Sequence, residues 1–430
     1  MYRRLHCLML VCAVVIFSGI SMISFQYHSR KSLLRCDEPH IPHLSRLAGA
    51  MSKELSETDW RELLQMVDLW LIQKGNFSKK PINRGTDIDR GFSKPRTNIF
   101  FLKTHKTASS TIINLLFRYG EFHNLTFAFP KNTHQFRYPK YFLAEEVYGF
   151  SSSEQQKFNI LCQHMRFSLD EVEKVMPSDT FYFTILRNPV TLMESSFAYF
   201  KNTSSFSKAK NIEDFLNNSN KFYQRDQLYS GFAKNPMTFD LGFDHNGPVS
   251  LKHFKLLWRA VDTIFDLVLI AEYFDESLVL LKDALCWNLD DVLSFPLNTR
   301  SDKSRSNVSD EAQERIKSWN QLDWQLYIYF NNSFWNHVER FGRKRMRYKV
   351  EELKKRRAQL SEKCLDSQVE PSLLKDKLML PHQSGLAKIL GYNLKSGLEQ
   401  NDQQLCHRLV LPEVQYNDLL KKKQVGLKSV

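Results

Sequence analysis

The sequence predicts an α/β protein built on a central parallel sheet flanked by helices. Short apolar runs rich in β-branched and aromatic residues alternate with longer stretches of helical spacing, which is typical of parallel strands joined by right-handed crossovers. With 430 residues, 42% hydrophobic and 25% charged, the chain has a globular composition and the length for one large α/β domain with appendages. Its 15 Gly, 14 Pro and 7 Cys exclude collagen-like and small disulfide-scaffold classes.

The expected elements begin at residue 98 and follow this alternation. Residues 98–103 are a short apolar run of the buried-strand type, and residues 109–119 carry apolar side chains at helical spacing. Beyond Ser309 the pattern is helical, including a long basic stretch at 332–363. The other expected strands lie at 158–162, 180–186 and 266–271, and the other expected helices start at Pro189 and span 274–287.

A run of 18 residues without a charged side chain, at positions 8–25, predicts an N-terminal membrane anchor. A cleaved signal peptide is the alternative, for which Gly19 and Ser21 would suit the cleavage site, but the run is long for a signal core. Either interpretation sends the rest of the chain into the secretory pathway. Acceptor sequences for N-glycosylation agree with a type II membrane protein; they start at Asn76, Asn124, Asn202, Asn217, Asn307 and Asn331.

Composition divides the chain into five parts, and a disulfide is expected within the last of them. In an oxidising lumen the five cysteines outside the apolar run allow two disulfides and one odd thiol, and Cys364 with Cys406 would clasp the tail. None has the spacing of a zinc site. The expected parts are a cytoplasmic tail (1–7), a transmembrane signal anchor (8–25), a stem (26–95), a main domain (96–340) and a helical C-terminal extension packing on it (341–430).

A polar loop separates the first expected strand from the first expected helix. Its residues 103–111 carry two Lys, one His and five hydroxyl side chains. In open α/β sheets ligands bind at such strand ends, and the amides of the following helix N-terminus add an anion site. The loop therefore predicts a phosphate or sulfate site, with a helix merely capped by Thr107 or Ser109 as the alternative. A Walker-type loop is disfavoured, because no Gly lies between Gly91 and Gly120.

Two further candidate elements follow later strands. Arg187 comes directly after the strand at 180–186, where its planar fork suits a phosphate, and Ser195 lies about two helical turns beyond it. Pairing of this Arg with a carboxylate is the alternative. His164 follows the strand at 158–162, and an imidazole that titrates near neutral pH suits a general base, although a structural His is common in such a position.

These elements together resemble the sulfotransferases that use 3′-phosphoadenosine 5′-phosphosulfate as donor. Residues 101–111, Phe-Leu-Lys-Thr-His-Lys-Thr-Ala-Ser-Ser-Thr, resemble the 5′-phosphosulfate loop of the galactose 3-O-sulfotransferases. The spacing of Arg187 and Ser195 matches the 3′-phosphate motif of the wider superfamily. The resemblance runs from about residue 98 to the tail. Segments at 272–282, 319–323, 331–335 and 390–395 most resemble the galactosylceramide sulfotransferases.

The resemblance implies a P-loop-like sulfotransferase fold and transfer of a sulfuryl group to the 3-hydroxyl of a terminal β-galactose, on galactosylceramide or a related glycolipid. It implies His164 as the base, Lys106 as the group that stabilises the leaving phosphate, and His105 as an aid and rival base. No metal is required, and the enzyme would be a single-pass type II protein of the Golgi membrane with a lumenal catalytic domain. The implied donor ligands are Lys103, Thr104, Lys106, Thr107, Ser109, Ser110, Thr111, Arg187 and Ser195.

Other interpretations stay open at this point. The acceptor would instead be an N- or O-linked glycan of a glycoprotein, or the chain would be a lectin of the same fold that binds glycans without turnover; a homo-oligomer is also allowed. The net charge of +13 by itself suits a nucleic-acid binder, which the anchor and the glycosylation sequences oppose. Residues 340–363 hold 11 basic and 3 acidic residues, predicting a solvated basic face. The loop at 297–301 would close over the donor through Asn298 and Arg300 or lie idle at the surface.

Overall fold

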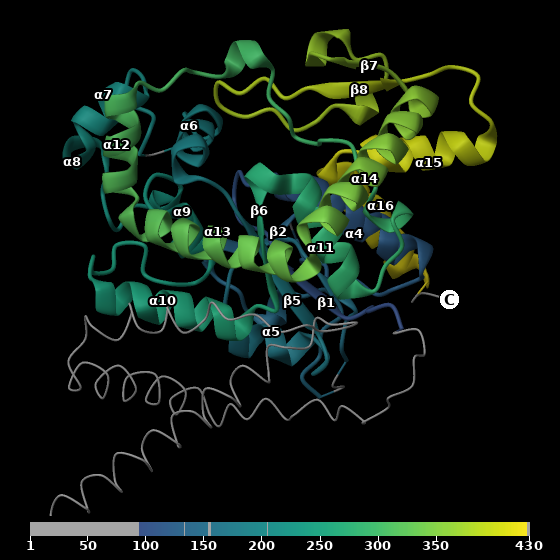
Figure 1. Ribbon diagram of the computed structural model, residues 1–430, viewed down its shortest axis with the longest axis horizontal. Coiled ribbons are helices and arrows are strands. Elements are labelled where there is room, and N and C mark those ends of the chain that lie inside the picture. The colour runs from purple at the N-terminus through teal and green to yellow at the C-terminus, as the bar shows by residue number, and fades with distance from the viewer. Residues whose placement is uncertain (1–93, 133, 154–155, 204, 428–430) are drawn as a thin grey trace, which may run out of the picture. The chain divides into compact units, whose positions relative to one another are not determined.

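The computed structural model places a four-stranded parallel sheet at the centre of an α/β unit (Figure 1). It describes residues 94–427 except 133, 154–155 and 204, so the predicted tail, the anchor and nearly all of the stem lie outside the described residues. The strand order is β3-β1-β5-β6, and every pairing in this sheet is parallel. The predicted α/β class with a parallel central sheet is therefore confirmed.

The strands of this sheet are short and buried. They are β3 Ile160–Leu161, β1 Ile99–Leu102, β5 Phe181–Leu186 and β6 Leu267–Ile270, each within a predicted strand. Every residue of β1 and of β6 is buried, which is the pattern expected of strands covered on both faces. Their apolar side chains belong to one continuous hydrophobic core.

The order of the strands creates a switch point between β1 and β5. From β1 the chain crosses to β3 on one side, whereas from β5 it crosses to β6 on the other side. Connections that leave neighbouring strands in opposite directions open a crevice at the carboxyl ends of those strands, where ligands of open α/β sheets bind. The loops that follow β1 and β5 are the two loops that the sequence singled out.

Helices surround the central sheet in Figure 1, and smaller two-stranded sheets are separate from it. A parallel pair, β2 Gln135–Tyr141 and β4 His164–Arg166, lies outside the main sheet and was not predicted. Among the described residues no helix is both long and apolar enough to cross a membrane. The helices up to residue 319 are α4 Ser109–Phe122, α5 Leu169–Val175, α6 Pro189–Tyr199, α7 Ile212–Asn217, α8 Ser219–Phe222, α9 Pro236–Asp240, α10 Leu251–Ile264, α11 Phe274–Leu285 and α12 Asp310–Trp319.

The C-terminal part differs from the expectation of continuous helix. Two long helices, α13 Gln321–Phe341 and α14 Arg343–Cys364, are separated at Gly342, whose φ of 96° favours glycine. An antiparallel pair follows, β7 Leu365–Val369 and β8 Gly391–Leu394. The chain ends in α15 Gln400–Val410 and α16 Glu413–Leu427.

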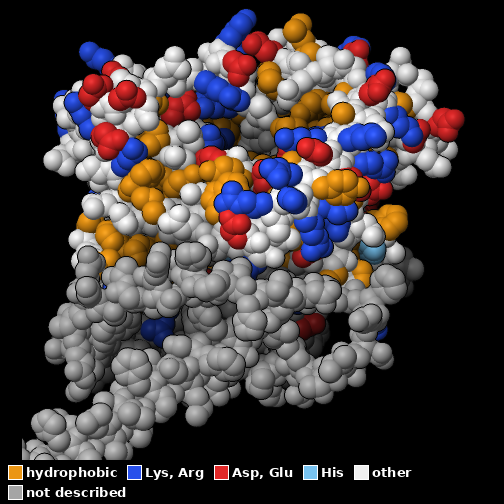
Figure 2. All heavy atoms as spheres, in the orientation of Figure 1, with side chains coloured by type: hydrophobic (Ala, Val, Ile, Leu, Met, Phe, Trp, Pro, Cys, Tyr) orange, Lys and Arg blue, Asp and Glu red, His pale blue; other side chains and the backbone are white. Residues whose placement is uncertain are grey.

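The basic helix α14 is not simply a solvated face. Arg357 pairs with Asp275, Arg345 with Asp283 and Arg356 with Asp290, so basic side chains of α14 reach carboxylates on and just after α11. Figure 2 shows Lys and Arg side chains with Asp and Glu among them over this region. Exposed pairs of this kind contribute about 0–1 kcal/mol each, so the packing of Leu353 and its apolar neighbours does more to hold α14.

The last two helices are tied to the body by a disulfide and by contacts with α4. Cys364 at the end of α14 is bonded to Cys406 in α15, as the sequence predicted. Tyr416 of α16 is fully buried and donates a hydrogen bond of 2.8 Å to Glu121 at the end of α4. The same carboxylate accepts from Arg408 of α15 at 2.8 Å. The C-terminal helices are therefore anchored to the helix that follows the polar loop.

Replacing both Cys364 and Cys406 with Ala should lower the free energy of unfolding by about 2–4 kcal/mol, because the bond closes a loop with a sequence separation of 42. Thermal unfolding of the body without its N-terminal segment measures this effect. Cys286→Ala is the control, since Cys286 is a free and exposed thiol and its removal should leave Tm unchanged. An unchanged Tm in the double variant would show that the bond does not stabilise the fold.

Candidate functional site

The loop after β1 lies at the switch point and has an unusual backbone. Lys106 and Ala108 adopt positive φ angles of 60° and 64° without being glycine. Such left-handed positions cost on the order of 1–3 kcal/mol each and cluster at ligand sites. Alternation of left- and right-handed residues turns successive amides toward one point and forms an anion-binding concavity. The start of α4 follows this turn directly, and the first amides of a helix are a common site for an anion.

The hydroxyl groups of this loop hold the loop itself together. Thr104 Oγ1 lies 2.8 Å from Thr107 Oγ1 and donates to the carbonyl oxygen of Ile185 in β5. Ser109 donates to the carbonyl oxygen of Thr104 at 2.8 Å. Thr111 Oγ1 accepts from the backbone of Leu297 at 3.0 Å. These side chains fix the shape of the loop by bonding within the protein, so they are not the groups first available to an anion.

Cationic side chains converge on the loop from three parts of the chain. Burial, together with the positive charges of Arg300, Arg187 and Lys103, lowers the pKa of Lys106 to about 7. The Lys106 ammonium lies 3.7 Å from the centre of the Tyr199 ring, a cation–π contact. Positive charges held this close are costly unless an anion joins them. The cluster is therefore built for a strongly anionic ligand.

Arg187 is where the sequence predicted it, at the edge of the loop. Its Nη1 donates to the Lys106 carbonyl oxygen at 2.8 Å and its Nε donates to Thr191 at 3.0 Å. Ser195 is buried in α6, two turns into that helix. The residue before it, Glu194, pairs with Arg300, so the loop at 297–301 does fold over this region. Arg300 is buried and is not part of an idle surface loop.

Two carboxylates from distant parts of the chain balance part of the charge. Glu413 at the start of α16 accepts from Lys103, and from Ser110 at 2.9 Å. Glu194 accepts from Arg300 and from the backbone of Ser306 at 3.0 Å. Lys103 is thereby neutralised by a protein group, whereas no carboxylate of residues 94–427, as far as they are described, is hydrogen-bonded to Lys106 or Arg187. No local sequence pattern connects Glu413 with the loop.

His105 is held from one side by a buried carboxylate. Asp240 at the end of α9 is fully buried and lies 2.9 Å from His105 Nδ1. It also accepts from the backbone N–H of His105 at 2.8 Å and from the Tyr138 hydroxyl at 2.9 Å. Asp240 thus selects the tautomer with hydrogen on Nδ1, which leaves Nε2 of a neutral imidazole as an acceptor. The sequence did not single out Asp240.

His164 stacks on His105 with the ring centres 3.9 Å apart and the planes at 11°. Burial lowers the pKa of His164 well below its ordinary value, and the neighbouring His105 and Lys103 lower it further. Its Nδ1 is buried without a hydrogen-bond partner in the described part of the chain. The two histidines that the sequence offered as rival bases are therefore in contact, but only His105 is oriented by a carboxylate.

Aromatic side chains enclose the histidine pair. Tyr138, Phe200 and Phe232 have ring centres 4.6, 5.9 and 5.0 Å from that of His105. Phe200 and Phe232 stack in parallel at 3.8 Å. This apolar surrounding excludes water from the His105 face and strengthens electrostatic interactions there.

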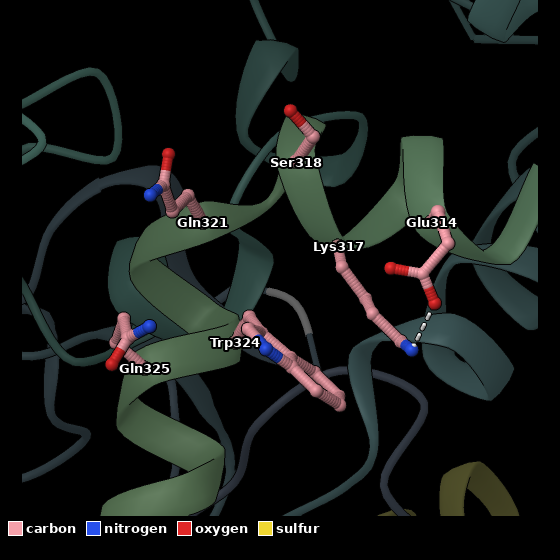
Figure 3. Close-up of a pocket in the computed structure, with 6 residues that line it drawn as sticks. All are labelled: Glu314, Lys317, Ser318, Gln321, Trp324 and Gln325. Atoms are coloured by element: carbon pink, nitrogen blue, oxygen red, sulfur yellow. Dashed lines mark hydrogen bonds and ion pairs between the residues drawn. The ribbon is translucent and has the colours of Figure 1, made fainter.

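A separate pocket of about 240 Å³ lies between α12 and α13 (Figure 3). Lys317 pairs with Glu314 at 2.6 Å and lies 4.9 Å from the centre of the Trp324 ring. The pocket shares no lining residue with the loop, the histidine pair or their partners.

Within the described ranges, no group of three or more His, Cys, Asp or Glu side chains could hold a metal ion. The site described above is therefore a cationic cradle next to an oriented imidazole.

Sulfate should stabilise the protein more at about pH 6 than at about pH 8.5. The pKa of Lys106 near 7 is far below its unfolded value, so the folded state loses this proton first as the pH rises. An anion favours the protonated form, and its binding weakens when that proton is absent. Sulfate is a useful probe because it does not titrate in this range, and the gain in Tm is measured in buffers of constant ionic strength.

Matched variants separate this effect from general stabilisation by sulfate. Lys106→Arg keeps the charge at both pH values, so its gain in Tm should depend little on pH. Lys106→Met reports the non-specific gain. An equal gain at both pH values in the unaltered protein would contradict the low pKa of Lys106 and its contact with the anion.

Known proteins are similar in sequence to most of this chain. The family model described as galactose-3-O-sulfotransferase matches residues 2–424. Galactose-3-O-sulfotransferase 2 of Sus scrofa is 47% identical over 89% of this chain and 96% of its own length. Human galactosylceramide sulfotransferase is 43% identical over 76% of this chain and 78% of its own, and human galactose-3-O-sulfotransferase 4 is 39% identical over 77% and 83%. The chain belongs to the galactose-3-O-sulfotransferase family and is a sulfotransferase.

Proposed function

We propose that this enzyme transfers a sulfuryl group from 3′-phosphoadenosine 5′-phosphosulfate to the 3-hydroxyl of a terminal β-galactose. The observation that carries the proposal is Lys106, a cation enclosed among cations at the amide-lined end of β1. The donor has phosphate groups at both ends of its nucleoside, and two sets of basic groups lie at the site. Sulfuryl transfer, like phosphoryl transfer, needs positioning and stabilisation of negative charge.

We assign the ends of the donor to different parts of the cradle. The amides of the loop and of the start of α4 suit the 5′-phosphate, with the shape of the loop set by its hydroxyl residues; these are Thr104, Thr107, Ser109, Ser110 and Thr111. Lys106 would stabilise charge that develops on the leaving phosphate. Arg187 and Ser195 suit the 3′-phosphate. Lys103 is already paired with the Glu413 carboxylate, so it would act on the donor only at longer range.

We propose His105 as the general base, which reverses the preference drawn from the sequence. Asp240 orients its Nδ1–H, and the same carboxylate would stabilise the imidazolium after Nε2 takes the proton of the sugar hydroxyl. His164 is the poorer base in this proposal, since burial lowers its pKa well below the ordinary value and no carboxylate of the described residues is bonded to it. Its ring would support His105 by stacking.

The acceptor is proposed as a terminal galactose without restriction to a ceramide carrier. The sequence favoured galactosylceramide or a related glycolipid, with glycoprotein glycans as the alternative. Relatives named only for galactose reach 47% identity over 89% of the chain, above the 43% over 76% of the relative named for galactosylceramide. An assay with both kinds of acceptor therefore has to decide whether the galactose is carried by a ceramide or by a glycoprotein glycan.

The anchor, the type II orientation and the Golgi location are part of the same proposal. Four of the predicted glycosylation sites in the described part, Asn124, Asn202, Asn217 and Asn307, are exposed, which suits a lumenal body. Asn331 differs, because it lies within α13 and its side-chain oxygen is buried. A galactose-terminated acceptor, and no nucleic acid, is the expected partner.

The lumenal body should transfer labelled sulfate from the donor to galactosylceramide, to a soluble β-galactoside, or to both. Lys106→Ala should lower kcat by about 10²–10³-fold, the range for loss of one group that stabilises the transition state. Lys317→Ala, in the separate pocket, is the control and should retain full activity. A folded protein that is inert on both acceptors would overturn the proposed function.

Replacement of the two histidines distinguishes between them as bases. His105→Ala should lower kcat by about 10²–10⁴-fold, the usual contribution of a general base. His164→Ala should lower it much less, since it removes only a stacked neighbour. The assignment is wrong if His164→Ala abolishes turnover and His105→Ala keeps most of it, provided that both variants show the Tm of the folded enzyme.

A further inference from the structure

The polar groups of the sequence motif at 319–323 converge on one short segment of the chain. The Trp319 Nε1–H donates to the carbonyl oxygen of Ala233 at 2.7 Å. Asn320 Oδ1 accepts from the backbone N–H of Asn235 at 2.8 Å. Asp323 accepts from the backbone N–H of Met237 at 3.0 Å and of Thr238 at 2.8 Å. Each contact holds residues 233–238, at the start of α9.

These hydrogen bonds are buried, so the loss of any one of them costs free energy. Asn320 is 1% exposed and Asp323 is fully buried, so each hydrogen bond has no competing water. Asp323 also accepts from the Thr238 hydroxyl at 2.7 Å, and its position at the first turn of α9 is that of a capping carboxylate. A buried acceptor that loses its donor costs about 1–3 kcal/mol, so α9 has one favoured position relative to α13.

The other end of α9 is fixed against the strand that carries His164. The Asp240 carbonyl oxygen accepts from the backbone N–H of Phe167, directly after β4, at 3.0 Å. Gly242 follows with φ of 88°, and a Cβ at this position would lie 2.3 Å from the Phe167 carbonyl oxygen. Such an approach requires glycine. The short helix α9 is therefore held at both ends.

We propose that Trp319, Asn320 and Asp323 form a clamp that sets the position of Asp240 and, through Asp240, the orientation of His105. The inference rests on the proposed function, because it assumes that His105 is the base. The clamp residues do not touch donor or acceptor in this assignment, so they are positioning residues. The role explains why a polar motif at the junction of α12 and α13 is tied to residues 233–238.

The contacts of Asp240 make this positioning consequential. The Asp240 carboxylate is hydrogen-bonded to the Nδ1 atom and to the backbone N–H of His105. It also accepts a hydrogen bond from the Tyr138 hydroxyl. A shift of α9 by about 1 Å would lengthen all of these hydrogen bonds together and release the imidazole to other rotamers. Misplacement of that size is enough to cost on the order of 10²-fold in rate.

Mild variants test the clamp without removing a buried charge. Trp319→Phe removes the indole N–H, and Thr238→Val removes the hydroxyl bonded to Asp323. Each should lower kcat by about 5- to 30-fold and leave the donor KM within about 2-fold, because the cradle is untouched. Trp258→Phe is the matched control, since the Trp258 Nε1–H donates to the carbonyl oxygen of Gln325 in α13 at 3.2 Å and not to the 233–238 segment. It should lower Tm comparably with an unchanged kcat.

A double-mutant cycle separates positioning from a general loss of stability. If Trp319 acts through Asp240, Trp319→Phe should cost little additional kcat in an Asp240→Asn background. Fully multiplicative effects, or an unchanged kcat in both clamp variants while His105→Ala is inactive, would overturn the clamp and leave the proposed function standing. If His105→Ala and Asp240→Asn retain full kcat, the base assignment itself fails.

Discussion

The accumulation of positive charge at the end of β1 is the constraint on which the site depends. Lys106 is forced into a left-handed backbone, against the ring of Tyr199 and near Arg187 and Arg300. The left-handed backbone and the crowded positive charges do not favour folding by themselves. The buried parallel sheet, the internal hydrogen bonds of the loop hydroxyls and the disulfide-linked C-terminal helices hold the loop in place. Stability elsewhere thus maintains an electrostatic arrangement that only an anionic ligand completes.

Local patterns predicted the elements that create this crevice. The strand at 180–186 and the helix from Pro189 are confirmed, as is the convergence of Arg187 on the loop after β1. Continuous apolar runs mark buried strands, and strand ends mark the ligand edge of a parallel sheet, so both are readable from sequence. The break at Gly342 between α13 and α14 was not predicted, because one glycine is a weak signal inside a strongly helical pattern.

Partners that are distant in sequence could not be predicted. Asp240 and Glu413 meet the loop through separations of 135 and 310 residues, and each carboxylate follows an ordinary helical or turn sequence. The resemblance therefore ranked His164 above His105, because the surroundings of the two imidazoles cannot be read from the sequence. Their surroundings distinguish them: one imidazole has a buried carboxylate on Nδ1, and the other has a buried Nδ1 without a partner in the described structure.

The ion pair of Lys103 with Glu413 has a consequence for the order in which the molecule is made. The sheet, the loop and α4 are complete once about residue 290 has been synthesised, whereas the carboxylate that neutralises Lys103 belongs to α16. Until that helix docks, the loop carries an uncompensated cluster of charges beside an unclasped α4. A nascent or C-terminally shortened chain would therefore present the crevice with this charge uncompensated. Docking of the last helix supplies the carboxylate, so the charge balance of the site depends on the final helix of the body.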